Sequence, residues 1–223
     1  MATAVKGRHP DSRRPGQART RLARRAVVDA ARSLFLERGY AATTIDAISD
    51  RSDVPPATVY RLFSGKLGIL TAVLDASIAG DDEDMALQDR PEVAALIAES
   101  DPRKQVAGFA GINVAINARS AGVYRILVSA AGSDAEAAAL LAEYIRLRDA
   151  GQRQIASLLA REGALRPDLT ERDAADIIHA LMSPELYRML VIERGWTPGR
   201  YEEWLAETLA AQLLTGVSRR SPR

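Results

Sequence analysis

The side chains with the clearest chemical purpose lie between residues 44 and 66. Thr44 is expected at the start of a short helix, where its hydroxyl and the free backbone N–H groups can bind a phosphate. Tyr60 and Lys66 lie on either side of the next helix and are placed to contact further phosphates. Small or amphipathic side chains let that helix approach the floor of a DNA major groove: Pro56, Ala57, Thr58, Tyr60 and Arg61.

Thiol chemistry and most metal chemistry are excluded by composition. The chain has no cysteine, so it has no disulfide, no thiolate metal site and no cysteine nucleophile. Two histidines, His9 and His179, are too few for a multi-histidine metal centre within one chain. His179 follows Ile177 and Ile178 with no recognisable Ser/Asp arrangement, so we expect a hydrogen-bonded helix histidine and not a catalytic base. We expect no catalytic residue, no metal and no cofactor.

One acidic cluster keeps an alternative open. Asp81, Asp82, Glu83 and Asp84 resemble half of a magnesium-binding site, and an all-helical metal-dependent enzyme would use them. No second matching acidic motif is visible, so we favour a solvated acidic loop.

The charge of the chain is unevenly distributed. Residues 1–70 hold 13 Lys/Arg against 6 Asp/Glu, whereas residues 71–218 hold 14 against 23, although the whole chain has a net charge of only +1. A basic segment on an acidic body indicates that the first part attracts phosphate and the second has another task. The segments 1–18 and 217–223 are predicted to be a disordered basic arm and a basic tail. The sequence has no apolar run long enough to span a membrane and no secretory signal, so we expect a cytoplasmic protein.

Apolar spacing predicts helices along the whole chain, and no strand pattern is convincing. A long helix ends at Gly39, a short helix follows Thr43 or Thr44, and Pro56 opens another short helix after a tight turn. Pro184 should break a later segment, with Ser183 as a new cap. The predicted helices cover about residues 20–38, 44–51, 56–63, 66–79, 91–99, 103–118, 121–131, 134–161, 170–194 and 198–215. The fold class is therefore all-α.

Two short helices joined by a tight turn after a longer helix form a helix-turn-helix. The stretch from Ala31 to Leu74 also resembles the DNA-binding domain of TetR-family transcriptional regulators. The resemblance rests on LFLERGY, the threonines at 43–44, Ile48, Val54, TVYRLF at 58–63 and Lys66. The segment from Ser183 to Ala206 resembles the last two helices of many actinobacterial members.

The resemblance implies a homodimer in which each subunit has an N-terminal three-helix DNA-binding domain and a larger helical domain for a small molecule and for dimerisation. It implies domain boundaries at 19–66 and 67–216. Thr44, Tyr60 and Lys66 match the family's phosphate-contacting positions. Pro56, Ala57, Thr58 and Arg61 match positions on or beside the base-reading surface.

Three departures from the family pattern affect the helix ends. Asp53 occupies a turn position where glycine is usual, and we expect Asp to tolerate the left-handed conformation. Pro55 replaces a serine cap and leaves the next helix without a side-chain cap. Gly65 and Leu67 replace a capping residue and an acid, which predicts a less rigid entry into the helix that links the domains.

The acidic part contains candidates for ligand binding and for dimerisation. A mostly apolar stretch with a few polar groups suits a small-ligand pocket; the candidates are Phe109, Asn113, Asn117, Tyr124 and Tyr144. Apolar stripes in the last helices either form a dimer surface or close the core of the monomer. The candidates there are Leu186, Leu190, Tyr201, Trp204, Leu205 and Leu209.

The sequence therefore predicts a ligand-responsive DNA-binding regulator, more specifically a repressor. It would bind a pseudo-palindromic operator as a homodimer and be released by a small molecule. Besides the metal-dependent enzyme, a DNA-binding architectural protein without a ligand is a further alternative. The effector and the operator are not predictable from the residues.

Overall fold

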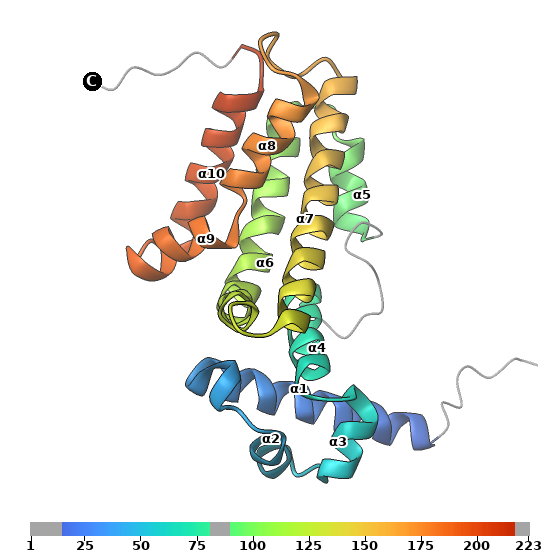
Figure 1. Ribbon diagram of the computed structural model, residues 1–223. Helices are drawn as coiled ribbons and strands as arrows, with labels where there is room; N and C mark the ends of the chain where they lie inside the picture. The colour runs from blue at the N-terminus through green and yellow to red at the C-terminus, as the bar shows by residue number, and fades with distance from the viewer. Residues whose placement is uncertain (1–14, 81–89, 217–223) are drawn as a thin grey trace, which may run out of the picture.

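The computed structural model describes residues 15–80 and 90–216, and this part of the chain is all-α. Its only β-type pairing is an isolated bridge between Leu165 and Leu214. Figure 1 shows a small N-terminal unit of three helices below a bundle of the later helices, with α4 rising from one into the other. The acidic cluster 81–84, most of the predicted arm 1–18 and the tail 217–223 lie outside the described residues.

The N-terminal unit consists of α1 (Pro15–Ala42), α2 (Ile45–Ser52) and α3 (Pro56–Phe63), followed by α4 (Lys66–Ala79). Gly39 has φ 80° and ψ 171°, so the regular part of α1 ends there, as predicted. The helix begins at Pro15 and not at Thr20, so residues 15–18 of the predicted disordered arm are helical. A proline is tolerated in the first turn of a helix because no N–H is needed there.

The bundle consists of α5 (Pro91–Ala98), α6 (Pro102–Ala131), α7 (Ala135–Arg161), α8 (Glu171–Leu181), α9 (Pro184–Tyr187), a π-helix (Arg188–Glu193) and α10 (Pro198–Leu213). The break at Pro184 is confirmed, since the Ser183 side chain accepts a hydrogen bond from the N–H of Leu186 and starts α9.

The prediction of two helices at 103–118 and 121–131 is wrong, because α6 is continuous over both. Gly122 lies inside the helix and lets α1 approach, since a Cβ there would be 2.9 Å from Leu36 Cδ2. Figure 1 shows the last turns of α6 nearly end-on while its first turns run along the bundle, so the helix bends.

Two hydrophobic cores meet in α6. The first joins α1–α4 to the end of α6 through Val123, Ile126 and Leu127. The second joins the beginning of α6 to α7, α8 and α10. No single described helix is both long and apolar enough to cross a membrane, although α3 and α4, bent by 67°, pass that test as a pair.

Candidate DNA-binding surface

Hydrogen bonds of the Thr44 and Ser49 side chains stabilise the two ends of the short helix α2. Thr44 caps its start, since the hydroxyl oxygen accepts a hydrogen bond from Ala47 N at 3.1 Å. Asp53 ends it with φ 53°, so aspartate does adopt the left-handed conformation. The buried hydroxyl of Ser49 donates to Val54 O at 2.7 Å and ties the turn to the helix. Thr44 is exposed and is the N-cap residue of α2, and a helix N-terminus is a favourable position for a phosphate.

The next helix, α3, presents its polar and small residues to solvent. Val59 and Phe63 are buried against the core, and Tyr60 is 54% exposed on the other side. Pro56, Ala57 and Arg61 are also exposed and Thr58 is half-buried. No side chain caps the start of α3, as the presence of Pro55 predicted. The exposed side of α3 is therefore an accessible, low-relief surface of the kind that enters a major groove.

Lys66 is held inward by the end of α1. Its Nζ donates to Tyr40 O at 2.9 Å and to Thr43 O at 3.0 Å, and it lies 4.4 Å from the centre of the Tyr40 ring. An ammonium group has three donors, so only one remains for a phosphate. In this structure Lys66 therefore joins α4 to the end of α1, while the phosphate contact stays a prediction.

The entry into α4 is fixed by close packing. Gly65 provides no side-chain cap, as predicted, but the next turn lies directly against α3. A Cβ at Gly68 would be 2.0 Å from the carbonyl oxygen of Phe63. The absence of a side chain at Gly68 thus sets how closely α4 follows α3, while the less rigid entry into α4 stays a prediction.

Two arginines near this surface are engaged within the protein, which sequence reasoning did not foresee. Arg24 Nη1 donates to Leu62 O at 3.3 Å, and its guanidinium carbon lies 4.7 Å from the Phe63 ring centre. Arg51 donates to Glu37 at 2.6 Å, which lowers the pKa of the Glu37 carboxyl.

The comparison with known proteins agrees with this geometry. The family model described as "Bacterial regulatory proteins, tetR family" matches residues 27–73, which include α2, α3 and most of α4. The match covers about a fifth of the chain and shows that this segment is similar to the TetR family.

Relatives and solved structures extend the likeness over the bundle. The HTH-type transcriptional regulator YdeS of Bacillus subtilis is 26% identical over 178 residues, covering 79% of this chain and 82% of that one. YvkB of the same organism is 40% identical over 48 residues, but the match covers only 22% of this chain and 25% of YvkB. NalD of Pseudomonas aeruginosa, the secondary repressor of the MexAB-OprM efflux pump, has a TM-score of 0.67 at 20% identity, covering 89% of this chain and all of that one. SmeT in complex with triclosan has a TM-score of 0.67 at 18% identity, covering 90% and 97%. At these identities the two structures establish the shared fold alone.

The candidate ligand residues of α6 and α7 lie in or beside a cluster of polar side chains in the bundle. Asn113 Nδ2 donates to Met182 O at 3.0 Å, and Asn117 Nδ2 donates to Asn113 Oδ1 at 3.0 Å. The Tyr124 hydroxyl donates to Glu185 Oε1 at 2.7 Å, and its ring centre is 5.3 Å from that of Tyr144. Phe109 is buried one turn before Asn113. Each amide nitrogen thus donates to a protein group, and the role of these residues toward a ligand remains a prediction.

His179 belongs to the same region and is hydrogen-bonded on both ring nitrogens, as expected. Its Nδ1 lies 2.7 Å from Gln152 Oε1, which only accepts, and its Nε2 lies 2.9 Å from Arg148 Nη2, which only donates. This pattern assigns the proton to Nδ1. Burial and the nearby guanidinium of Arg148 lower the pKa of His179, whereas the carboxylates of Asp149, Glu185 and Asp176 raise it by less.

A pH dependence of stability follows. Because folding lowers the pKa of His179, its contribution to stability is complete above its ordinary value of 6.5 and is lost as the pH falls through the lowered value. We expect the melting temperature to fall between about pH 7 and pH 5, before ordinary carboxylates titrate. His179→Gln should flatten this slope in thermal melts, and an unchanged slope would contradict the assignment.

The candidate dimer residues divide into two groups. Tyr201, Leu205 and Leu209 are at most 2% exposed, because α10 packs against α6 and α8 within the monomer. These three side chains therefore close the core of the monomer, which is the alternative that the sequence left open, and a role in a dimer stays a prediction. Leu186, Leu190 and Trp204 are half-buried and keep exposed area.

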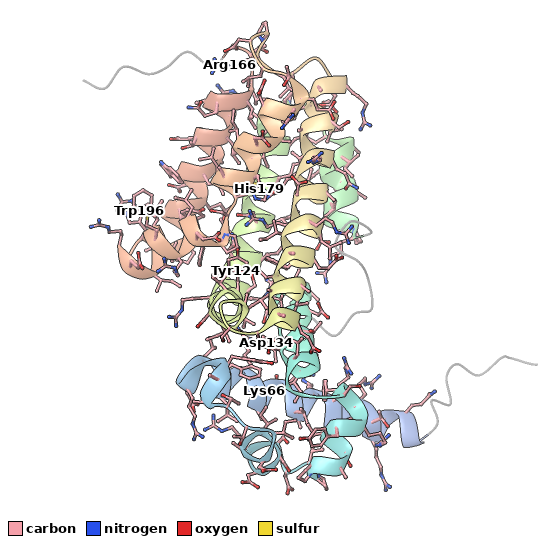
Figure 2. The ribbon with its side chains drawn as sticks, viewed as in Figure 1. Lys66, Tyr124, Asp134, Arg166, His179 and Trp196 are labelled. Atoms are coloured by element: carbon pink, nitrogen blue, oxygen red, sulfur yellow. The ribbon has the colours of Figure 1, made fainter. Side chains whose placement is uncertain are left out.

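A hydrogen-bonded junction connects the bundle to the DNA-binding unit. Arg119 of α6 donates from Nε to Ser77 O and from Nη2 to Ile78 O, each at 3.1 Å, and so caps the end of α4. Arg32 of α1 donates to Arg119 O at 3.1 Å. Figure 2 shows the labelled Tyr124 at the lower end of the bundle, close to the DNA-binding unit.

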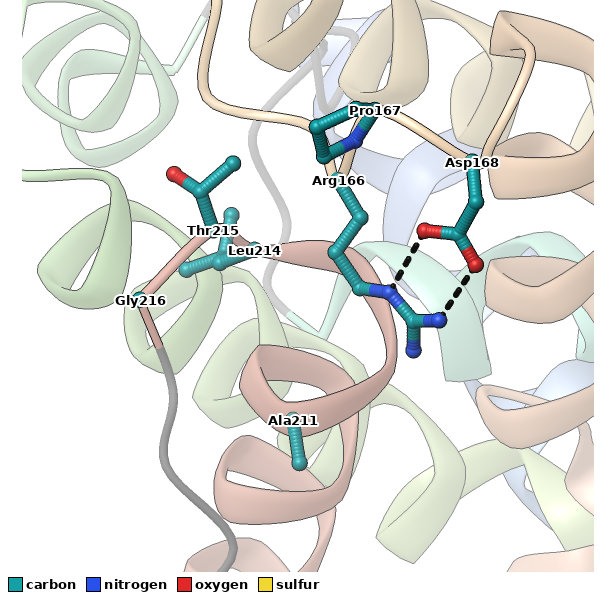
Figure 3. Close-up of a pocket in the computed structure, with 7 residues that line it drawn as sticks. All are labelled: Arg166, Pro167, Asp168, Ala211, Leu214, Thr215 and Gly216. Carbon is teal, nitrogen blue, oxygen red and sulfur yellow. Dashed lines mark hydrogen bonds and ion pairs between the residues drawn. The ribbon is translucent and has the colours of Figure 1, made fainter.

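A surface pocket lies at the other end of the bundle. It is lined by Arg166, Pro167, Asp168, Ala211, Leu214, Thr215 and Gly216 (Figure 3), and Arg166 is paired with Asp168. None of the candidate ligand residues lines it, and Figure 2 labels Arg166 far from Tyr124 and His179.

Proposed function

We propose that this protein is a repressor that binds a pseudo-palindromic operator as a homodimer and leaves it when a small molecule binds the helical bundle. The observation that best supports this proposal is the exposed side of α3, which lies beside the capped start of α2. The repressor NalD, similar in fold, and SmeT, solved with triclosan, support this proposal by analogy. Such a regulator would act in the cytoplasm.

In the proposed complex, two copies of α3 enter successive major grooves about one helical turn of DNA apart. Thr44, Tyr60 and the remaining Lys66 donor would contact phosphates. Pro56, Ala57, Thr58 and Arg61 would face base edges. Leu186, Leu190 and Trp204 are the candidate dimer residues that retain exposed area, and size-exclusion chromatography with light scattering tests the dimer.

The hydrogen bonds from Arg119 to the end of α4 connect the bundle to the DNA-binding unit, and we propose that they transmit the effect of ligand binding. A ligand that binds the bundle more tightly in one arrangement of α6 than in another would shift the end of α4 and the spacing of the two α3 helices. Spin labels on both α3 helices measure that distance. An unchanged distance distribution at a saturating concentration of a confirmed ligand would refute this route.

The primary experiment is fluorescence-anisotropy binding to DNA from the region upstream of the protein's own gene, against a scrambled duplex, over a salt series. Preference for the native duplex with a steep salt dependence is the expected result. Equal weak binding to all duplexes in a genome-wide selection would favour an architectural protein. The metal-dependent enzyme rests on residues 81–84, which lie outside the described part of the chain.

Tyr60→Ala is expected to weaken operator binding by about tenfold or more, since a hydrogen bond to a charged phosphate contributes about 1.5–3 kcal/mol. Tyr60 is 54% exposed, so the melting temperature should barely change. Tyr60→Phe is the matched variant, because it removes only the hydroxyl. Native affinity of Tyr60→Phe in the anisotropy assay would contradict a phosphate contact by that hydroxyl.

A further inference from the structure

Arg148, beside His179 in the bundle, is a cation whose hydrogen-bond partners are all neutral. Arg148 of α7 donates from Nη2 to the ring nitrogen and the carbonyl oxygen of His179, at 2.9 and 3.2 Å. Its Nε is buried and has no hydrogen-bond partner. Within residues 15–80 and 90–216, no carboxylate forms an ion pair with this guanidinium. A buried donor without an acceptor is costly, and more so on a charged group.

The groups around Arg148 come from three helices of the bundle, α6, α7 and α8. Tyr144, Arg148 and Gln152 follow at four-residue spacing and share one face of α7. Tyr124 of α6 lies against Tyr144, and His179 of α8 completes the surroundings of the guanidinium. Figure 2 shows His179 and Tyr124 one above the other, between α7 and the helices α8 and α9.

We propose that Arg148 binds the carboxylate of a small organic acid whose apolar body lies against Tyr124 and Tyr144. A carboxylate offers two acceptor oxygens in the plane and at the spacing that the arginine fork requires, so it can satisfy Nε and Nη2 together. The neutral ring of His179 occupies one of these positions in the present structure and would be displaced. This inference rests on the proposed function, in which the bundle binds a small molecule.

The carboxylates of Asp149, Glu185 and Asp176 act on His179, but they do not oppose this assignment strongly. Asp149 is paired with Arg153, and Asp176 is exposed. Glu185 is exposed and already accepts the Tyr124 hydroxyl at 2.7 Å. Solvent screens an exposed charge, whereas the attraction of a partly buried guanidinium is screened much less. An acid is therefore favoured over its neutral amide.

The test is calorimetric titration of the full-length protein, without DNA, with benzoate, phenylacetate and octanoate and with the corresponding primary amides. At least one acid is expected to bind about tenfold more tightly than its amide, as expected when a charge-assisted pair is lost. Equal affinity of acid and amide, or no binding of any of the three acids at millimolar concentration, would overturn the proposal.

Variants at two neighbouring arginines of α7 locate the effect. Arg148→Gln should remove the preference for the acid, and Arg148→Lys, which keeps the charge but not the fork, should reduce it. Arg146→Gln is the matched control, because Arg146 is 71% exposed and paired with Glu143. Native acid binding by Arg148→Gln would refute the site. If Arg148→Gln does not fold, the acid–amide comparison in the native and Arg148→Lys proteins decides.

The titration is independent of DNA. A protein that prefers its operator but binds no acid loses only this inference, whereas a protein that binds acids without operator preference loses only the proposed regulation.

Discussion

The Gly68→Ala protein is expected to melt well below the native protein and to lose its preference for operator DNA. A Cβ at residue 68 would lie 2.0 Å from the backbone carbonyl oxygen of Phe63, closer than any two such atoms approach. The obstacle is backbone, so relief requires α3 to move relative to α4. Overpacking of this kind costs about 1–3 kcal/mol or more. Each kcal/mol corresponds to about 2–4 °C in melting temperature for a protein of this size.

Gly151→Ala is the matched control for this prediction. Gly151 is also inside a helix, but a Cβ there meets nothing within 4 Å. Alanine should therefore stabilise α7 by up to about 1 kcal/mol. Thermal melts and operator binding of both variants provide the comparison. A Gly68→Ala protein with native melting temperature and native affinity would show that the α3–α4 packing is not as tight as described.

Lys66→Met is expected to lower the free energy of unfolding by about 2–3 kcal/mol. The substitution removes two charge-assisted hydrogen bonds, to Tyr40 O and Thr43 O, and the contact with the Tyr40 ring. Methionine retains most of the apolar length of the side chain, so the loss reports on the ammonium group. The measurement is chemical denaturation, followed by operator binding over a salt series.

A pure phosphate contact would give a different result. It would leave the unfolding free energy unchanged and reduce the salt slope of DNA binding by about 1. Arg61→Met should have that second signature, because Arg61 is exposed on α3. If Lys66→Met behaves like Arg61→Met, the inward contacts of Lys66 contribute nothing measurable to folding.

The local features of the DNA-binding unit were predictable from the sequence. The order of α2, turn and α3 follows from apolar spacing and from Thr44, Asp53 and Pro56, each of which acts within a few residues. The inward position of Lys66 was not predictable. It bonds carbonyls 23 and 26 residues earlier in the chain, and residue type alone does not say which distant carbonyl an ammonium group meets.

The bundle was less predictable for the same physical reason. Periodicity identified Tyr201, Leu205 and Leu209 as a buried stripe, but it does not say whether the same chain or a second copy buries it. Asn113 and Asn117 are buried, as their apolar neighbours suggested, whereas Arg148 was missed. The four-residue spacing of Tyr144, Arg148 and Gln152 was the available signal.

The sharing of α6 by both cores bears on the construction of hybrid regulators. Exchange of residues 19–66 alone would leave the new DNA-binding unit against the native Val123, Ile126 and Leu127, which are shaped for another partner. A chimaera should therefore transplant the last turns of α6 together with α1–α4, or redesign that face. Because both cores include α6, the DNA-binding unit and the bundle should unfold in a single transition. A protease should then not release an intact N-terminal fragment.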